Sequence, residues 1–451
     1  MGDHTNDPAV TDEELAAFHR TVGRLRALPL DDPRRKRGEE IAATFARESR
    51  NKRRKAQRQA RSDADAALTA ATATGATDRR EDAPLALRHG SPGEFAKPRH
   101  CYVCKAVYRR ADAFYHRLCP SCAADNAARR SSSTDLSGRR VLLTGGRVKI
   151  GFQLALMMLR DGAELLVTSR FPQDTLRRFH AAEGSERWRD RLTVVAVDLR
   201  DPRQVLGLCE RLHAEGRPLD ILVNNAAQTI RRPPESYALL AAAEHGELPA
   251  DSRVLTAPGF RPFAALPAAA GALALVLDQE ADEAGLLPDL RAHNSWSARL
   301  GELDPAELLE TQLVNALAPA LLCDRLLPLL LASPHPRRYV VNVTAVEGRF
   351  AVRNKTSGHP HTNMAKAALN MLTRTSADDL AARGVHMCSV DTGWITDENP
   401  APRKARIAAA GTRTPLDVVD GAARVYDPIV RGEAGDPVAG VFLKDYREAA
   451  W

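Results

Sequence analysis

The sequence predicts an α/β protein whose main part is a doubly wound, mostly parallel sheet of about seven strands. Two observations predict it. From residue 135 onward, short apolar runs alternate with stretches of helical periodicity, the pattern of a parallel sheet covered by helices on both faces. The first apolar run also leads into a glycine-rich turn that opens a helix, and ligands of such folds bind at that edge of the sheet.

The composition and the N-terminal sequence limit the class of protein and its cellular location. The 451 residues are 44% hydrophobic and 27% charged, ordinary values for a chain that buries a sizeable core. No uninterrupted apolar run reaches the length of a membrane span, so we expect no contact with a membrane. The N-terminus lacks the basic-then-apolar layout of a secretory signal, and Asn6 breaks the myristoylation pattern. We therefore expect a cytoplasmic protein in a reducing environment.

Residues 1–98 are expected to form a charged arm, helical or disordered, followed by a linker. Between residues 34 and 61, twelve Lys or Arg accompany only three acidic residues, although the whole chain carries a net charge of only +7. The composition of this stretch favours helix, but its apolar residues are too sparse for a buried face. Two interpretations stay open: a solvated helix, or a basic surface for nucleic acid or another acidic partner.

Residues 99–130 form a second, small unit that contains four of the seven cysteines, in the pattern C-x2-C-x14-C-x2-C. Each C-x2-C pair can direct two thiolates to one point, and two pairs complete a tetrahedral site. A segment this short needs a covalent or metal cross-link to fold, and disulfides do not persist in a reducing compartment. The pattern predicts a structural zinc ion rather than redox-active or incidental thiols, with four ligands: Cys101, Cys104, Cys119 and Cys122.

Residues 135–451 carry the alternating pattern. The expected strands are 141–145, 164–170, 192–199, 220–227, 338–345, 385–393 and 440–446. The expected helices are 151–162, 202–216, 305–333 and 363–384, the third kinked or divided at Pro319 and Pro328. Residues 228–304 interrupt this rhythm. An insertion of that length above a ligand crevice is usually functional, and it could form a lid, a substrate wall or a partner surface.

The glycine-rich turn, Thr144–Gly151, is a candidate dinucleotide site. Gly145 and Gly146 permit a tight turn, and the amides at the start of the next helix can bind a pyrophosphate. An acidic residue at the end of the second strand would bind a free ribose 2′-hydroxyl, but Ser169 and Arg170 stand there instead. This pair suits a 2′-phosphate, so we expect NADP rather than NAD.

With this turn, the NNAA segment (224–227), Asn315, Lys366 and the VDTGWI segment (390–395), residues 135–451 resemble the short-chain dehydrogenase/reductase family. The resemblance implies a Rossmann-type domain and hydride transfer between NADP(H) and a carbonyl or alcohol. It also implies a homo-oligomer. With the residues of the glycine-rich turn and the Ser169–Arg170 pair, the expected cofactor contacts are Thr144, Gly145, Arg147, Lys149, Ile150, Gly151, Ser169, Arg170, Asp198, Leu199, Asn224, Ala226, Lys366, Thr392, Gly393 and Ile395.

The chain departs from the family pattern at its catalytic residues. Lys366 and Asn315 match, but Thr362 stands in the position of the family's Tyr, and Ala345 in that of its Ser. We predict that His361, next to the Tyr position, is the proton donor, because an imidazole titrates near working pH. The other interpretation places His361 in a surface loop. Thr344 could replace the missing Ser hydroxyl.

Further departures concern the cofactor turn. Lys149 occupies the middle glycine of the family's TGxxxGxG, and Thr392 replaces the proline of its usual PG. Two functions therefore compete: an NADP-dependent oxidoreductase acting on an unidentified small molecule, or a catalytically silent nucleotide-binding sensor or interaction module. A nucleic-acid-binding protein built on the cysteine unit is a variant of the second.

Overall fold

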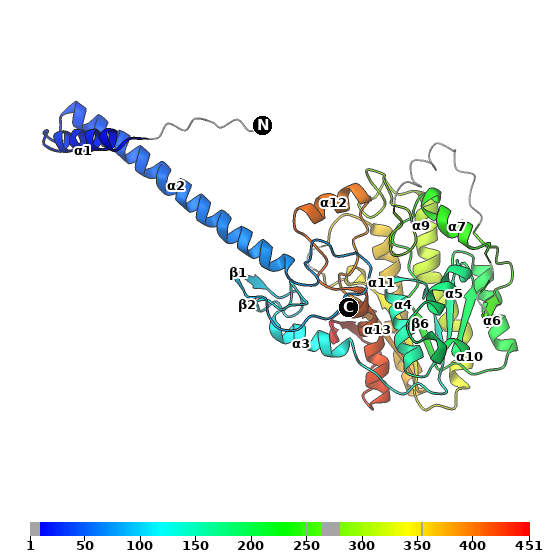
Figure 1. Ribbon diagram of the computed structural model, residues 1–451. Coiled ribbons are helices and arrows are strands. Elements are labelled where there is room, and N and C mark those ends of the chain that lie inside the picture. The colour runs from blue at the N-terminus through cyan, green and yellow to red at the C-terminus, as the bar shows by residue number, and fades with distance from the viewer. Residues whose placement is uncertain (1–9, 247, 249–250, 264–279, 353–354) are drawn as a thin grey trace. The chain divides into compact units, whose positions relative to one another are not determined.

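The computed structural model describes residues 10–246, 248, 251–263, 280–352 and 355–451 (Figure 1). Its contacts divide the chain into two units, Met1–Ala67 and Leu68–Trp451. We describe each unit by itself. The expected boundaries at residues 98 and 135 remain a division by sequence.

The first unit is a helical hairpin made of α1 (Asp12–Arg26) and most of α2 (Pro33–Ala70) (Figure 1). A capping box opens α1: Thr11 Oγ1 accepts the Glu14 amide, and the Glu14 carboxylate accepts the Thr11 amide. The two helices meet closely at Gly38, where an added Cβ would lie 2.7 Å from Leu25 Cδ1. The basic stretch is helical, as its composition predicts, and its Lys and Arg side chains are largely exposed.

The second unit begins with a segment that its composition indicated as linker, but residues 72–76 are buried. The amides of Ala73 and Thr74 donate to the carbonyls of Ala113 and Phe114, so this segment packs on the cysteine unit. The cysteine unit itself consists of an antiparallel pair and one helix: β1 (Glu94–His100), β2 (Val107–Arg110) and α3 (Pro120–Arg129).

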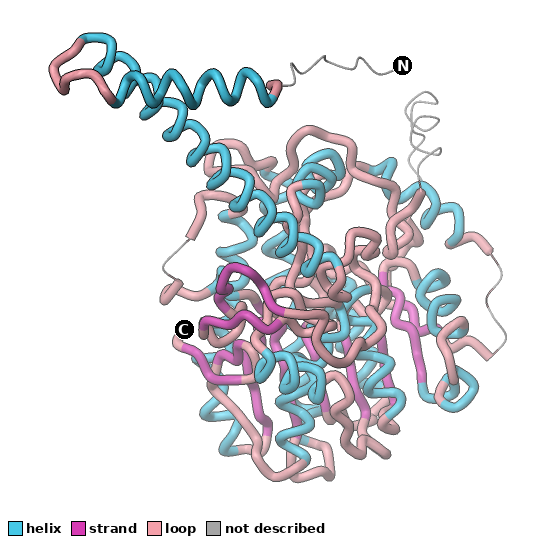
Figure 2. The backbone as a smooth tube through the Cα atoms, turned by 60° about the vertical axis from the view of Figure 1, so that its left-hand side comes forward, coloured by secondary structure: helices cyan, strands magenta, loops and turns pink. Residues whose placement is uncertain are grey.

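The main sheet has the order β11-β10-β9-β8-β6-β3-β4-β5-β7 in the described residues. The strands are the magenta segments in Figure 2. Every pairing is parallel except that between β10 and β11, which confirms the doubly wound, mostly parallel sheet. Two short strands exceed the predicted seven; one of them, β7, comes from the insertion and extends the edge beside β5. The strands are β3 (Arg140–Leu143), β4 (Glu164–Ser169), β5 (Leu192–Ala196), β6 (Ile221–Asn224), β7 (Val254–Thr256), β8 (Arg338–Thr344), β9 (Val385–Asp391), β10 (Phe442–Lys444) and β11 (Arg447–Ala449).

Helices cover both faces of the sheet, and each face has its own hydrophobic core. One core includes side chains of α4, α5 and α13, and the other includes side chains of α6, α10 and α11. Cys209 and Cys323 lie in the second core and Cys388 in the first, as buried small side chains. The helices are α4 (Lys149–Arg160), α5 (Pro172–His180), α6 (Pro202–Ala214), α7 (Ala238–Ala243), α9 (Pro305–Gln312), α10 (Ala318–Leu331), α11 (Pro360–Ala382), α12 (Ala401–Ala409) and α13 (Val418–Glu433).

The long helix after the insertion is divided by a π-helical turn at Leu313–Leu317. Pro319 lacks the N–H that would bond to the carbonyl of Asn315, which explains why the regular ladder breaks there, whereas Pro328 lies inside α10. By length and hydropathy alone, Pro305–Leu331 is the single described helix that could cross a membrane. Half of its most apolar window is buried inside the fold, where α10 packs on α6.

Candidate functional site

The glycine-rich turn forms a tight cradle at the start of α4. An added Cβ at Gly151 would lie 2.1 Å from the Gly145 carbonyl oxygen, and one at Gly145 would lie 2.8 Å from Ala226 Cα. Gly145 also has a φ of +70°, so glycine is required at both positions. The amides of Ile150 and Gly151 donate to no acceptor in the described part of the chain. Free amides at a helix start are an anion-binding arrangement.

Lys149 replaces the family's middle glycine and takes a φ of +55°. Its ammonium lies 2.9 Å from Asp82 Oδ2 and 3.6 Å from Glu398 Oε1. Burial alone would lower the pKa of Lys149, but the carboxylates of Glu398 and Asp82 outweigh it and raise that pKa. The lysine is therefore charged and held at the rim by two acids, and the cradle beside it stays open.

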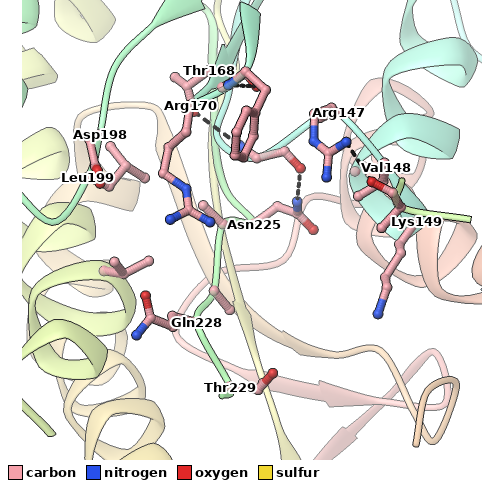
Figure 3. Close-up of a pocket in the computed structure, with 18 of the residues that line it drawn as sticks. Arg147, Val148, Lys149, Thr168, Arg170, Asp198, Leu199, Asn225, Gln228 and Thr229 are labelled. Atoms are coloured by element: carbon pink, nitrogen blue, oxygen red, sulfur yellow. Dashed lines mark hydrogen bonds between the residues drawn. The ribbon is translucent and has the colours of Figure 1, made fainter. Parts of the chain in front are cut away.

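A cavity of about 380 Å³ lies against this cradle (Figure 3). It is lined by the glycine-rich turn, the ends of three neighbouring strands and part of the insertion. From the predicted cofactor contacts it includes Gly145, Arg147, Lys149, Ile150, Gly151, Ser169, Arg170, Asp198, Leu199 and Ala226. Thr144 lies beneath the turn and accepts the Asn225 and Ala226 amides through Oγ1. Thr392, Gly393, Ile395 and Lys366 are absent from the lining.

Arg170 extends into this cavity between Asp198 and Asn225, whereas Arg147 and Lys149 lie on the opposite side (Figure 3). The Arg170 guanidinium pairs with no carboxylate among the described residues. It lies 5.6 Å from the ring centroid of Tyr237, which the insertion contributes. A free guanidinium beside an aromatic ring suits a phosphorylated nucleoside.

The other charged residues of the lining are paired. Arg147 lies 2.7 Å from Asp174. Asp198 is bound by Arg200 at 2.6 Å. Burial alone would raise the pKa of Asp198, but the Arg200 hydrogen bonds outweigh it and lower that pKa. Ser169 accepts the Phe171 amide through its hydroxyl. Arg170 is therefore the residue of the Ser169–Arg170 pair that is available to a ligand.

Lys366 lies in α11 and is buried against the end of β8. Its Nζ donates to the carbonyl oxygen of Val343 at 2.8 Å, and no carboxylate among the described residues pairs with it. Burial lowers the pKa of Lys366 from 10.5 to about 8. Such an amine keeps a labile proton near neutral pH, which is the requirement for a proton-transfer site.

Three other residues at the family's catalytic positions or beside them have polar, uncharged side chains: Thr362, Thr344 and Asn315. Thr362, in the position of the family's Tyr, is buried, and its Oγ1 has no partner among the described residues. Thr344 Oγ1 donates to the Lys366 carbonyl at 3.4 Å, so this hydroxyl is engaged with α11. Asn315 lies in the π-helical turn, where its side chain exchanges hydrogen bonds with the backbone of Gln228 at 2.7 and 2.9 Å.

His361 lies in the first turn of α11 and is fully buried, not in a surface loop. Neither ring nitrogen has a partner among the described residues. Burial lowers the pKa of His361, and the neighbouring His359 lowers it further. The ring of His359, by contrast, has a partner: it stacks on Trp296 with 4.2 Å between the ring centroids. An unpartnered buried imidazole next to Thr362 leaves hydrogen-bonding capacity for a ligand.

Beyond β9, the chain turns at Gly393, which has a φ of +83°. Burial raises the pKa of Asp391, the last residue of β9, to about 6, and its carboxylate accepts the Val346 amide. Ile395 is buried and packs with the cysteine unit.

The four cysteines come together as the spacing predicts. Their Sγ atoms all lie within 4.8 Å of one another, and Cys104 and Cys119 are 3.7 Å apart. Tetrahedral Zn–S bonds of about 2.3 Å place sulfur atoms about 3.8 Å apart, so the four thiols fit a zinc ion. The two nearby histidines are engaged elsewhere: His116 contacts Thr74 Oγ1 at 2.8 Å, and His100 contacts the Lys105 carbonyl.

Comparison with known proteins agrees with this architecture. A family profile described as short chain dehydrogenase matches residues 139–243, and one described as enoyl-(acyl carrier protein) reductase matches residues 281–419. An uncharacterized protein of Acanthamoeba polyphaga mimivirus is 31% identical over 356 residues, covering 73% of this chain and 71% of that protein. The chain belongs to the short-chain dehydrogenase/reductase family.

Other similar proteins match shorter stretches. The C-signal protein of Myxococcus xanthus is 33% identical over 126 residues, which are 28% of this chain and 74% of that protein. Among solved structures, a short chain dehydrogenase from Burkholderia cenocepacia in complex with NADP is 22% identical, with a TM-score of 0.45. That match covers 69% of this chain and 97% of the other.

The structure adds residues to the cofactor side of this short-chain dehydrogenase/reductase. Asn224 donates to Asn342 inside the sheet, and its neighbour Asn225 lines the cavity and caps the Gly145 carbonyl. The NNAA motif contained that signal, because alternate residues of a strand end face opposite sides. Tyr237, from the insertion, and Glu398 also line the cavity, and both come from segments distant from the glycine-rich turn.

Proposed function

We propose that this chain is an NADP(H)-dependent oxidoreductase that acts on a carbonyl or an alcohol. The observation that carries the proposal is the cavity between the free amides of Ile150 and Gly151 and the unpaired guanidinium of Arg170. The amides suit the pyrophosphate and Arg170 suits the 2′-phosphate, while Tyr237 offers an aromatic face near the adenosine end. When bound, the nicotinamide would supply or accept the hydride.

The remaining steps belong to side chains of α11 and its neighbours. Lys366 would hold the ribose hydroxyls of the cofactor through the protons that it does not donate to Val343, and Thr344 would align the substrate oxygen after giving up its 3.4 Å bond to the Lys366 carbonyl. His361 would move the proton that the absent Tyr moves elsewhere in the family. Because burial lowers the pKa of His361 below its usual 6.5, it is neutral at pH 7 and suited to accept a proton from an alcohol. Carbonyl reduction needs the protonated imidazole, so its rate should rise with falling pH only below the usual pKa of a histidine.

The test begins with NADPH binding, followed by turnover on a panel of carbonyls and alcohols with wild type, His361→Ala, Lys366→Ala and His359→Ala. We expect His361→Ala and Lys366→Ala to lower kcat at least a hundredfold, the usual contribution of acid–base catalysis. His359→Ala is the matched control, since its ring is stacked on Trp296, and it should stay within about threefold of wild type. Full activity of His361→Ala would reject this proton donor.

For the cysteine cluster, we propose a structural zinc ion. Four protein thiolates leave no open coordination position, so the ion would hold the fold of residues 99–130 and take no part in the reaction. Purified full-length protein should contain about one zinc per chain by mass spectrometry of the metal, as the four-thiolate site requires. Less than half an equivalent, after purification without chelator, would contradict the assignment.

A second candidate, a nucleotide-binding sensor or interaction module without turnover, rests on Thr362 and Ala345 in the positions of the family's Tyr and Ser. It also gains support from the separation between the cavity lining and Lys366. In that case the exposed basic stretch of α2 would bind an acidic partner such as nucleic acid. NADPH binding with no turnover on any substrate, and with binding unaffected by His361→Ala, would favour this candidate.

A further inference from the structure

The cysteine unit shares a hydrophobic core with the dinucleotide site. Ile395, from the segment after β9, packs with buried side chains of the cysteine unit, among them Cys101 and Leu118. Ile150, from the glycine-rich turn, packs against the same core. Both isoleucines rest on α13, where an added Cβ at Gly421 would lie 2.3 Å from Ile395 Cδ1 and 2.9 Å from Ile150 Cγ1.

One polar contact joins the same two regions. Tyr102 lies between the first two cysteines, and its hydroxyl accepts the backbone N–H of Trp394 at 2.9 Å. Among the described residues, Tyr102 is the acceptor for that amide. A Cβ added at Gly393 would lie 3.6 Å from the same hydroxyl, so the tyrosine sits directly on the turn. Arg117, close to the second cysteine pair, lies 5.7 Å from the Trp394 ring centroid.

The cysteine unit depends on its cross-link for this placement. It has one short antiparallel pair and one helix, too little to bury an independent core. A hydrogen bond joins the two cysteine pairs: the backbone amide of Cys119 donates to Cys101 Sγ at 3.3 Å. A metal that binds all four thiolates would therefore fix Tyr102 relative to α3, and its loss would free the tyrosine from Trp394.

We infer that Tyr102 is a positioning residue of the dinucleotide site, and that metal binding at the four cysteines and cofactor binding stabilise each other through it. The inference rests on the proposed function and on the family resemblance, which implies cofactor contacts at Thr392, Gly393 and Ile395, although these residues lie outside the lining of the described cavity. Ordering of this segment by the metal raises cofactor affinity, and the bound cofactor holds the segment against Tyr102. Binding linkage is reciprocal, so each ligand changes the affinity of the other by the same factor.

The experiment uses the full-length zinc-loaded chain and compares wild type with Tyr102→Phe. Tyr108→Phe is the matched control: its hydroxyl donates to the His116 carbonyl within the same unit, away from the turn. We measure the NADPH dissociation constant by fluorescence, and zinc release to a chromophoric chelator with and without saturating NADPH. We expect NADPH to slow zinc release at least fivefold in wild type and in Tyr108→Phe. Tyr102→Phe should bind NADPH about tenfold more weakly and lose most of this protection.

Hydrogen exchange of the peptide 388–400 separates this inference from the proposed function. Tyr102→Phe should speed exchange at the Trp394 amide at least tenfold even without cofactor, and Tyr108→Phe should not. If NADPH fails to bind wild type, the proposed function fails, and unchanged exchange would overturn the role of Tyr102 as well. NADPH binding that is equally tight with and without zinc, or in Tyr102→Phe, would overturn the coupling while leaving the oxidoreductase intact.

Discussion

Replacing Lys366 by methionine should stabilise the fold while it removes activity. Burial lowers the pKa of this lysine from 10.5 to about 8, which corresponds to about 3 kcal/mol for keeping the ammonium charged at pH 7. The lysine recovers about 1 kcal/mol through its hydrogen bond to the Val343 carbonyl. Methionine has a similar length and no charge, so we expect Lys366→Met to raise the unfolding free energy by about 2 kcal/mol at pH 7.

The sign of the pH dependence follows from the same pKa. The folded lysine loses its proton above pH 8, whereas the unfolded lysine keeps it up to pH 10.5. The stability of wild type relative to the variant should therefore rise between these values, and the advantage of methionine should fall to about zero near pH 9.5.

Urea unfolding followed by tryptophan fluorescence is the assay, because all four tryptophans lie after residue 67 and report on the unit that contains the sheet. Lys36→Met, at an exposed position of α2, serves as the control and should change neither the midpoint nor its pH dependence. A Lys366→Met protein that is less stable than wild type at pH 7, or equally altered at pH 7 and 9.5, would refute the reasoning.

Three other substitutions test the site and its frame. Gly151→Ala places a Cβ 2.1 Å from the Gly145 carbonyl and should weaken NADPH binding at least tenfold by fluorescence titration; unchanged affinity would mean that the turn can relax. Arg170→Glu should lower the preference for NADPH over NADH by about ten- to a hundredfold, and a retained preference would assign the 2′-phosphate to another cation. Arg130→Met leaves the buried Asp417 carboxylate without its partner at 2.5 Å and should cost about 3–5 kcal/mol in urea unfolding, whereas a loss below about 1 kcal/mol would contradict that pairing.

The parts of the fold set by local pattern were predictable. Apolar runs such as 141–145 became central strands, and the four cysteines met because two C-x2-C pairs bring thiols together with little dependence on the rest of the chain. Asn315 was predicted as a site residue and lies in an irregular turn. Pro319 explains that irregularity through a backbone bond it cannot make.

The rest of the site depends on contacts between distant segments. Asp82 precedes Lys149 by many residues and Glu398 follows it by many more. Local spacing in the sequence could therefore not have shown that both carboxylates pair with this lysine. Tyr237 reaches the cavity through an insertion whose composition has no distinctive pattern. The burial of His361 could not be predicted either, since its segment is polar, a feature that also suits an exposed turn.

The insertion contributes an edge strand to the main sheet, and this limits how the chain can be shortened. Its strand β7 pairs along β5 over Val254–Thr256, and a three-residue border strand offers little backbone for another molecule to join. Excising residues 228–304 to obtain a minimal protein would leave the outer edge of β5 unpaired at Val194–Ala196, and the same cut would remove Tyr237. Such a trimmed protein would also lose Leu255 and Ala257 from the core that includes α6 and α10, and it would self-associate through the exposed strand edge.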